Sequence, residues 1–301
     1  VMFLLLAQQS GQLTFASFAA HHGALPLGLK SWLFGCCLIG FGAKAGLIPL
    51  HIWLPEAHPA APSHISALMS GVMLKTAVYG FLRCVFDFLA PFPDWWGTVL
   101  VCAALLTALL GINYASVEND LKRLLAYSSI ENMGIVFLAI GLTMIFIANG
   151  QPLWSHLFLV AALLHCLNHA VFKSLLFMAA GSVLSVTHTR SLENMGGLIH
   201  KMPVTAVLFL VGALAISAFP PLNGFLSEWM IFQGLVLSTG HLSEFFRVLL
   251  PLGAALLGLT GAVVTVTFAK AFSGAFLAMP RSHHVQYAKE VSGAMLAGMA
   301  I

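Results

Sequence analysis

Charged residues are scarce in this sequence. Only 8% of its residues are Asp, Glu, Lys or Arg, whereas about a quarter of an ordinary soluble domain is charged. The formal net charge is +3 and the basic residues are scattered, so no basic stripe for nucleic acid is present. With 59% hydrophobic residues and a mean hydropathy of +0.95, this composition excludes a soluble domain or a nucleic-acid partner and predicts an integral membrane protein.

Patterned cysteines and cofactor motifs are also missing. The five cysteines lie in apolar runs and form neither a CxxC pair nor a Cys/His metal spacing, so we interpret them as small hydrophobic residues. No CxxC cluster and no GxGxxG motif after a strand offers a place for an iron–sulfur, nickel or flavin group. We therefore expect no cofactor and no metal in this chain.

Long apolar runs are what the sequence has instead. A membrane span needs about 20 mostly apolar residues, and such runs begin near Ser31, His64, Gly97, Leu124, His156, Pro203 and Arg247. The turns between them are short, which predicts one domain over residues 1–301, an all-α transmembrane bundle. Because residues 1–7 and the residues from Val291 onward read as partial spans, we expect a fragment of a longer chain.

The basic residues predict an orientation. If the spans alternate, one membrane face carries Lys122, Arg123, Arg190, Lys201, Arg281 and Lys289, and the other carries Lys30, Arg83 and Arg247. The positive-inside rule makes the first face cytoplasmic.

Lysines lie inside the apolar runs, where each one costs about 2.5–3.5 kcal/mol at mid-bilayer on insertion scales. Lys44 stands among Gly42, Gly46 and Pro49, which predict a broken helix beside the charge. A broken helix frees carbonyls and admits water, so Lys44 is a relay candidate, with snorkelling to the interface as the alternative. Lys75 lies deeper in its run and is a second candidate, with a fixed pairing to an acid as the alternative.

One helical face combines three titratable residues. His165, His169 and Lys173 follow one another at intervals of four, which places them on one face about 6 Å apart. Histidine exchanges protons near neutral pH, so the row predicts a proton relay. Hydrogen-bonded histidines without a relay function are the alternative. A metal site is disfavoured because no HExxH-like acid stands between the histidines.

Glu228 follows a second proline and glycine interruption, in SAFPPLNGFLSE. We interpret it as the last member of the relay, which releases the proton to water, with an interfacial glutamate as the alternative. Four residues are secondary candidates: Lys270, Glu131, His51 and His58. Lys270 lies near the end of its apolar run, and Glu131 lies just inside a span, where a role in anchoring at the membrane face is favoured. His51 and His58 surround the turn Trp53–Pro55, where they either take up protons or are simply polar residues of a solvated loop.

Long stretches resemble a known family: GAKAGLIPLHIWLPEAHPAAPSHISALMSGVMLKTAVYG, DLKRLLAYSSIENMG, LLHCLNHAVFKSLLFMAAGSV and AISAFPPLNGFLSEWMIF. They are similar to the antiporter-like membrane subunits of respiratory complex I, Mrp-type sodium/proton antiporters and membrane-bound hydrogenases. Within this family, HPAAPSHISALMSG and THTRSLENMGGLIHKMP most resemble the membrane subunits of hydrogenase-4 and formate hydrogenlyase, which belong to the group 4 nickel–iron hydrogenases.

The resemblance implies a fold of about fourteen helices, built from two inverted repeats that each contain one discontinuous helix. Lys44 matches the family's broken-helix lysine, and Lys75 matches the lysine of the following helix. The row on residues 165–173 matches the central-axis segment, and Glu228 matches the terminal site. The family's first-channel glutamate, which pairs with the lysine at position 44, is expected on a helix before Val1.

The expected function is that of a proton-translocating subunit of a [NiFe] hydrogenase or formate hydrogenlyase complex in a bacterial or archaeal cytoplasmic (inner) membrane. Nickel–iron and iron–sulfur centres are expected in partner subunits. The expected partners of this chain are other membrane and peripheral subunits, lipid and protons, with sodium as a further candidate ion. An Mrp-like cation/proton antiporter that works without redox partners is the alternative. A scaffold that has lost pumping is disfavoured by the set of buried ionisable groups.

Overall fold

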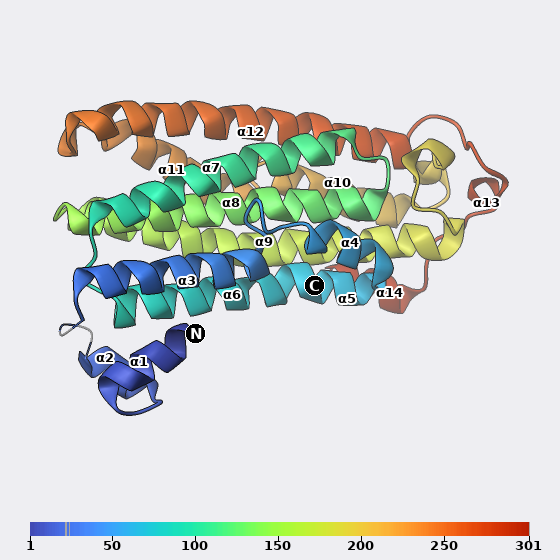
Figure 1. Ribbon diagram of the computed structural model, residues 1–301. Coiled ribbons are helices and arrows are strands. Elements are labelled where there is room, and N and C mark those ends of the chain that lie inside the picture. The colour runs from blue at the N-terminus through green and yellow to red at the C-terminus, as the bar shows by residue number, and fades with distance from the viewer. Residues whose placement is uncertain (22, 24, 301) are drawn as a thin grey trace.

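The computed structural model describes residues 1–300 apart from His22 and Ala24. The described residues are mostly helical and form no strand, only an isolated antiparallel bridge between Asp120 and Ser191. This confirms the all-α prediction. In the same residues, five helical units are long and apolar enough to cross a membrane: Ser63–Phe88, α7 (Asp94–Val117), α8 (Leu121–Ala148), α9 (Pro152–Thr187) and α12 (Glu244–Phe276), which lie side by side in Figure 1.

Shorter helices complete the bundle. The unit Ser63–Phe88 consists of α5 (Ser63–Leu68), a π-helical segment at Met69–Met73, α6 (Leu74–Leu82) and a second π-helical segment at Arg83–Phe88. The others are α1 (Met2–Ser10), α2 (Phe15–His21), α3 (Leu27–Ala45), α4 (Trp53–Ala60), α10 (Pro203–Ile216), α11 (Asn223–Leu237), α13 (His283–Gln286) and α14 (Gly293–Ala300), with 3-10 turns at Leu192–Asn194, Leu198–His200 and Thr239–His241.

The predicted helix breaks are present. The chain leaves α3 at Gly46, whose φ of 89° ends the helix, and begins α4 only at Trp53. The run that starts at Pro203 is likewise two helices, α10 and α11, and not one span. Pro220 and Pro221 lie between them, and neither has a backbone N–H to continue the helical hydrogen bonds. Each break therefore places non-helical backbone at the depth of the neighbouring spans.

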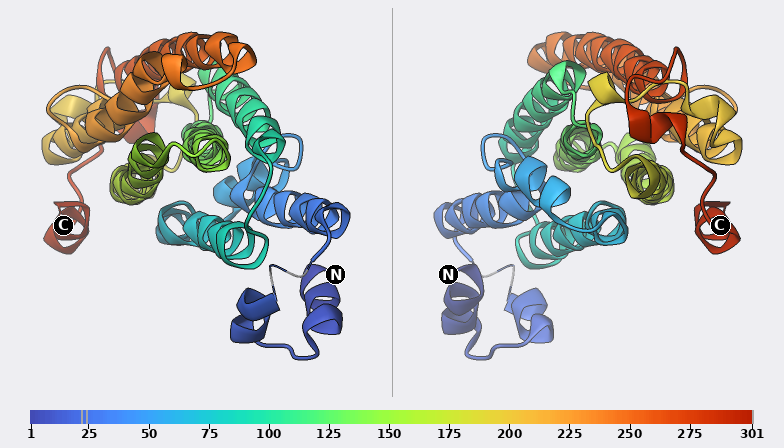
Figure 2. Two further views of the ribbon diagram at one scale, coloured as in Figure 1. Left: turned by 90° about the vertical axis from the view of Figure 1, so that its left-hand side faces the viewer. Right: turned by 90° about the vertical axis from the view of Figure 1, so that its right-hand side faces the viewer.

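Helix α8 forms the centre of the bundle. It packs mainly against α7 and α9, as the views along the helix axes in Figure 2 show, and 94% of the residues in its apolar 18-residue stretch are buried. Glycines allow α7 and α8 to approach closely: a Cβ added at Gly134 would lie 2.6 Å from the Ala108 nitrogen, and one at Gly97 would lie 2.6 Å from the Gly141 oxygen. This packing removes the polar residues of α8 from lipid.

We predict that Gly134→Ala destabilises the protein, by about 1–3 kcal/mol, because the new methyl group overlaps the backbone of α7. Gly35→Ala is the matched control: Gly35 lies inside α3 and a Cβ there meets nothing within 4 Å, so this change should be neutral or stabilising. SDS titration of the purified variants in micelles measures both free energies of unfolding. Equal values for the two would contradict the close approach.

Candidate functional site

Helix α9 carries the predicted row into the core. His165, His169 and Lys173 are each 0% exposed, because their spacing of four residues puts all of them on the face of α9 that packs on α8 and α11. The row is therefore shielded from lipid, and each of its members depends on protein groups for hydrogen bonds.

His165 joins three helices. Its Nδ1 lies 3.0 Å from the hydroxyl of Ser227 on α11, and its Nε2 lies 3.1 Å from Oδ1 of Asn132 on α8. Asn168 donates to the same hydroxyl at 3.0 Å and to the carbonyl of Asn223 at 2.7 Å. The start of α11, directly after the second helix break, is thus attached to the row by hydrogen bonds.

Lys75 reaches the row from α6. Its ammonium donates to the carbonyl oxygen of Ser70 at 2.5 Å and makes a short contact with Nδ1 of His169. The other ring nitrogen of His169, Nε2, is buried and has no hydrogen-bond partner in the described part of the chain. The alternative of a fixed pairing between Lys75 and an acid does not occur among the described residues, where no ion pair includes Lys75.

Lys173 is held by neutral groups. Its ammonium donates to the carbonyl of Leu125 at 3.0 Å and to the hydroxyl of Ser128, both on α8, and lies 5.8 Å from the centre of the Phe268 ring on α12. No ion pair within residues 1–21, 23 and 25–300 involves it. These contacts leave the ammonium without a carboxylate in direct contact, so dipoles and the aromatic ring are its immediate partners.

Glu131 belongs to the core. Anchoring at the membrane face is wrong for this residue, because it is 1% exposed in the middle of α8 and accepts a hydrogen bond from the Asn132 amide. It interacts electrostatically with Lys173 and Glu228. Glu131 is therefore a buried carboxyl group within electrostatic range of both the row on α9 and the acid on α11.

Glu228 lies one residue after Ser227, the residue that contacts His165. It is partly buried and lines a cavity of about 240 Å³ between α11 and α12, together with Ala218, Trp229 and Gly258. The interruption between α10 and α11 thus places a carboxyl group beside the buried row and next to an open space.

Lys44 and Lys270 lie apart from this row. Lys44 is in the last turn of α3, beside the predicted break, but its side chain is exposed and lines a cavity of about 440 Å³ with residues of α1. The Lys270 ammonium donates to the carbonyls of Ser116 (3.0 Å) and Glu118 (2.9 Å) at the C-terminal end of α7. These contacts satisfy helix-end carbonyls, as basic residues often do at such ends.

The two loop histidines are not equivalent. His51 lies in the first helix break, with its ring centre 6.3 Å from that of Tyr114 and 6.5 Å from that of Tyr127, and its buried Nδ1 has no hydrogen-bond partner among the described residues. His58, on α4, is 0% exposed and stacks on Phe177. Solvated loop polarity is therefore wrong for His58.

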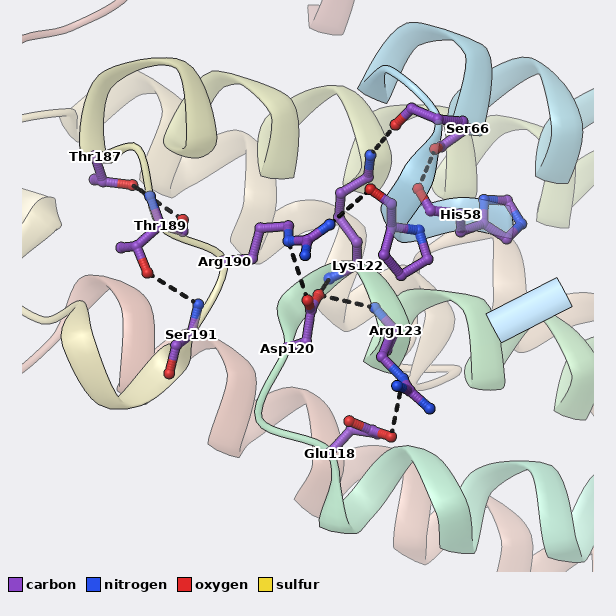
Figure 3. Close-up of polar contacts among 12 residues, drawn as sticks. His58, Ser66, Glu118, Asp120, Lys122, Arg123, Thr187, Thr189, Arg190 and Ser191 are labelled. Atoms are coloured by element: carbon purple, nitrogen blue, oxygen red, sulfur yellow. Dashed lines mark hydrogen bonds and ion pairs between the residues drawn. The ribbon is translucent and has the colours of Figure 1, made fainter. Parts of the chain in front are cut away.

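A polar cluster closes one end of the bundle (Figure 3). Asp120 caps α8 by accepting from the Lys122 backbone N–H at 2.9 Å, and its other oxygen lies 3.1 Å from Nε of Arg190. Arg190 donates to the carbonyl of Pro59 at 2.6 Å, and the Lys122 ammonium donates to the carbonyl of Ala61 at 2.5 Å. The cluster thereby ties the end of α4 to α8 and to the loop after α9.

Sequence reasoning missed the uncharged members of the site. Asn132 and Ser128 on α8, Ser227 on α11 and Ser70 before α6 supply direct partners of His165, Lys173 and Lys75. One signal was available: Ser128 and Asn132 are four residues apart in a membrane-spanning helix, which puts both on one helical face. In the described residues, no group of three or more His, Cys, Asp or Glu side chains is arranged to hold a metal ion.

A helical membrane bundle with two broken helices and a buried row of ionisable side chains defines the class of antiporter-like membrane subunits. The sequence pattern of the NADH:quinone oxidoreductase/Mrp antiporter transmembrane family matches residues 1–252, and the chain belongs to this family. It is therefore an integral membrane protein.

Curated relatives narrow the comparison. The chain is 46% identical to hydrogenase-4 component B of Escherichia coli K12, with 100% of this chain and 45% of the relative covered. It is 42% identical to formate hydrogenlyase subunit 3 of the same strain, with 94% of this chain and 46% of the relative covered. The chain thus spans about half the length of the curated relatives it matches.

Solved structures share the fold. A chain of the archaeal membrane-bound sulfane sulfur reductase superposes with a TM-score of 0.85 at 26% identity, covering 99% of this chain and 47% of that one. A chain of respiratory complex I from Thermus thermophilus gives a TM-score of 0.81 at 26% identity, covering 99% and 58%. The fold of this protein therefore matches that of membrane subunits of respiratory complexes.

We predict that His165→Leu destabilises the protein, by about 1–3 kcal/mol, because Asn132 and Ser227 then lose a buried partner. His165→Gln should cost less, since an amide can still bond to one of them. SDS titration in micelles compares the variants with the wild type. A leucine variant as stable as wild type would show that these contacts contribute nothing.

Proposed function

We propose that this chain translocates protons as a membrane subunit of a [NiFe] hydrogenase or formate hydrogenlyase complex in the cytoplasmic membrane. One observation carries the proposal: partly buried Lys75 contacts His169, which is buried together with Lys173 and Glu131, and neither lysine is neutralised by an ion pair in the described chain. Two relatives with 46% and 42% identity are named as subunits of hydrogenase-4 and formate hydrogenlyase, which supports the kind of complex.

The contacts suggest the direction of the relay within the protein. A proton on Lys75 passes to Nδ1 of His169, and the ring releases a proton from its unpartnered Nε2 toward Lys173. Glu131 and then Glu228 receive it next, since Glu131 interacts electrostatically with both Lys173 and Glu228. In so apolar a core each charge disfavours a like charge beside it, so the two lysines are protonated one after the other and not at the same time. His165 orders the row, and Lys44, beside the first break, supplies Lys75.

The energy for this movement comes from outside the chain. We propose that the domain is one transmembrane unit within a longer protein, and that other membrane and peripheral subunits carry the nickel–iron and iron–sulfur centres. Their redox chemistry changes the charge beside this chain and thereby drives the relay. In this proposal Lys270 has a structural role, because its ammonium is taken up by two helix-end carbonyls.

Glu228→Gln should stop proton movement while the complex still assembles, because glutamine fills the same space but cannot titrate. Glu228→Asp should retain part of the rate. The control is Glu244→Gln on the exposed start of α12, which should pump normally. Vesicles that contain the whole complex report acidification of the lumen, and hydrogenase activity with artificial acceptors reports assembly. Normal pumping by Glu228→Gln would refute its role.

Lys75→Ala should likewise abolish or strongly reduce coupled proton movement, and it should leave the protein folded, because removing a partly buried cation relieves its desolvation cost. Lys201→Ala, at an exposed position in the loop after α9, is the matched control. Loss of the variant from the membrane would instead identify Lys75 as a structural residue.

The same vesicles separate this function from a cation/proton antiporter that works without redox partners. Redox-coupled pumping requires a nickel–iron subunit that co-purifies with the chain and supplies the driving reaction. Sodium-dependent proton movement in vesicles that contain only the full-length subunit would favour the antiporter.

A further inference from the structure

His58 carries a buried imidazole. Its side chain is 0% exposed, and neither Nδ1 nor Nε2 has a partner in the described part of the chain. The ring stacks on Phe177 of α9 with centroids 4.6 Å apart and an interplanar angle of 14°. Stacking on Phe177 covers one face of the ring but provides no hydrogen bond to either ring nitrogen. Burying a polar atom without a hydrogen bond costs free energy in a protein interior.

Two buried ammonium groups, those of Lys122 and Lys173, lie near this ring. Phe177 follows Lys173 by four residues, so the ring stacks one helical turn from that lysine. On α8, Lys122 and Leu125 are one turn apart; Lys122 donates to the carbonyl of Ala61, near His58, and Lys173 donates to the carbonyl of Leu125. His58 interacts electrostatically with both lysines.

One of these lysines belongs to the membrane face. Lys122 lies in the first turn of α8, next to the Asp120 and Arg190 pair, whose side chains are 22% and 40% exposed. Figure 3 shows His58 and Lys122 in this cluster. The backbone at the ring is fixed as well, since the Ser66 hydroxyl donates to the His58 carbonyl at 3.0 Å. The ring of His58 therefore lies within a few residues of the groups that bind Lys122 at the face and one helical turn from Lys173 in the core.

We propose that His58 passes protons between Lys122 at the membrane face and Lys173 in the core, as a second branch that meets the row at Lys173, so that a full transport cycle needs both this branch and Lys75. This inference rests on the proposed proton translocation. One ring nitrogen accepts a proton from the Lys122 ammonium while the other gives its own proton to the Lys173 amine, with water bridging the gaps. The ring ends neutral with its N–H on the opposite nitrogen, and a ring flip restores the start.

The site suits transfer better than storage. Two neighbouring ammonium groups and complete burial both disfavour a charged imidazole, so a proton that enters the ring leaves it again. The basic residues of this end of the bundle make it the cytoplasmic face by the positive-inside rule. The branch would thus take up protons from the cytoplasm.

The test uses the full-length protein within its complex, in vesicles. His58→Phe keeps the stacking on Phe177 without ring nitrogens, and His58→Gln keeps polarity without titration. Both should slow the formation of membrane potential by roughly a hundredfold, the lower end for losing a positioned proton-transfer group. His200→Gln, the same change at an exposed position in the loop after α9, should behave as wild type. Wild-type rates in assembled His58→Phe would overturn the proposal.

A rescue experiment excludes a purely structural role. His58→Gly leaves room for added imidazole, which should restore the rate, whereas pyrazole has a similar shape but is a far weaker base and should not. Membrane potential is read with a voltage-sensitive dye, because imidazole itself buffers a pH gradient, and wild type with each additive is the control. Equal rescue by both compounds, or by neither in an assembled complex, would show that His58 is structural.

Glu228→Gln in the same vesicles separates the two proposals. If it blocks transport while the His58 variants are normal, only the His58 branch is wrong. If Glu228→Gln, Lys75→Ala and wild type all behave alike, the proposed function itself fails.

Discussion

The Lys173 ammonium is the constraint on which the rest of the structure depends. It lies in an apolar core with a carbonyl, a hydroxyl and an aromatic ring as partners, and no ion pair in the described chain neutralises it. A carboxylate in direct contact would fix the charge in place. Dipoles stabilise the cation less, so the lysine can release its proton at moderate cost, provided that the packing of α8 and α9 keeps competing water out.

Neutral polar residues make such a core possible. Asn132, Ser128 and Ser227 satisfy the row without adding charge. Each comes from a different position on α8 or α11, and the break before α11 lets its first turn approach α9. The discontinuous helix therefore has two effects: it exposes backbone at depth and it allows a hydroxyl to reach His165. A straight helix through the same space would provide neither.

Local sequence rules were sufficient for much of this architecture. Gly46 predicts the first break, and the consecutive prolines Pro220 and Pro221 predict the second. The spacing of four residues predicts which side chains share one face of α9. Both predictions follow from backbone geometry. Packing partners were not predictable in this way. Glu131 stands a few turns into α8, and only the contacts of α7 and α9 around it make it a core residue. Lys270 likewise finds its carbonyl acceptors on a helix distant in sequence.

The π-helical segment Met69–Met73 has a consequence for how this site can change in evolution. An extra residue in a turn shifts the phase of the following helix by roughly 100°. The register of α6 is therefore set by five residues that make none of the contacts of Lys75 apart from the Ser70 carbonyl. Loss of one residue here would rotate Lys75 away from α9 and toward another neighbour, without altering a single titratable group. Length in this segment is thus under as strict a constraint as residue identity elsewhere.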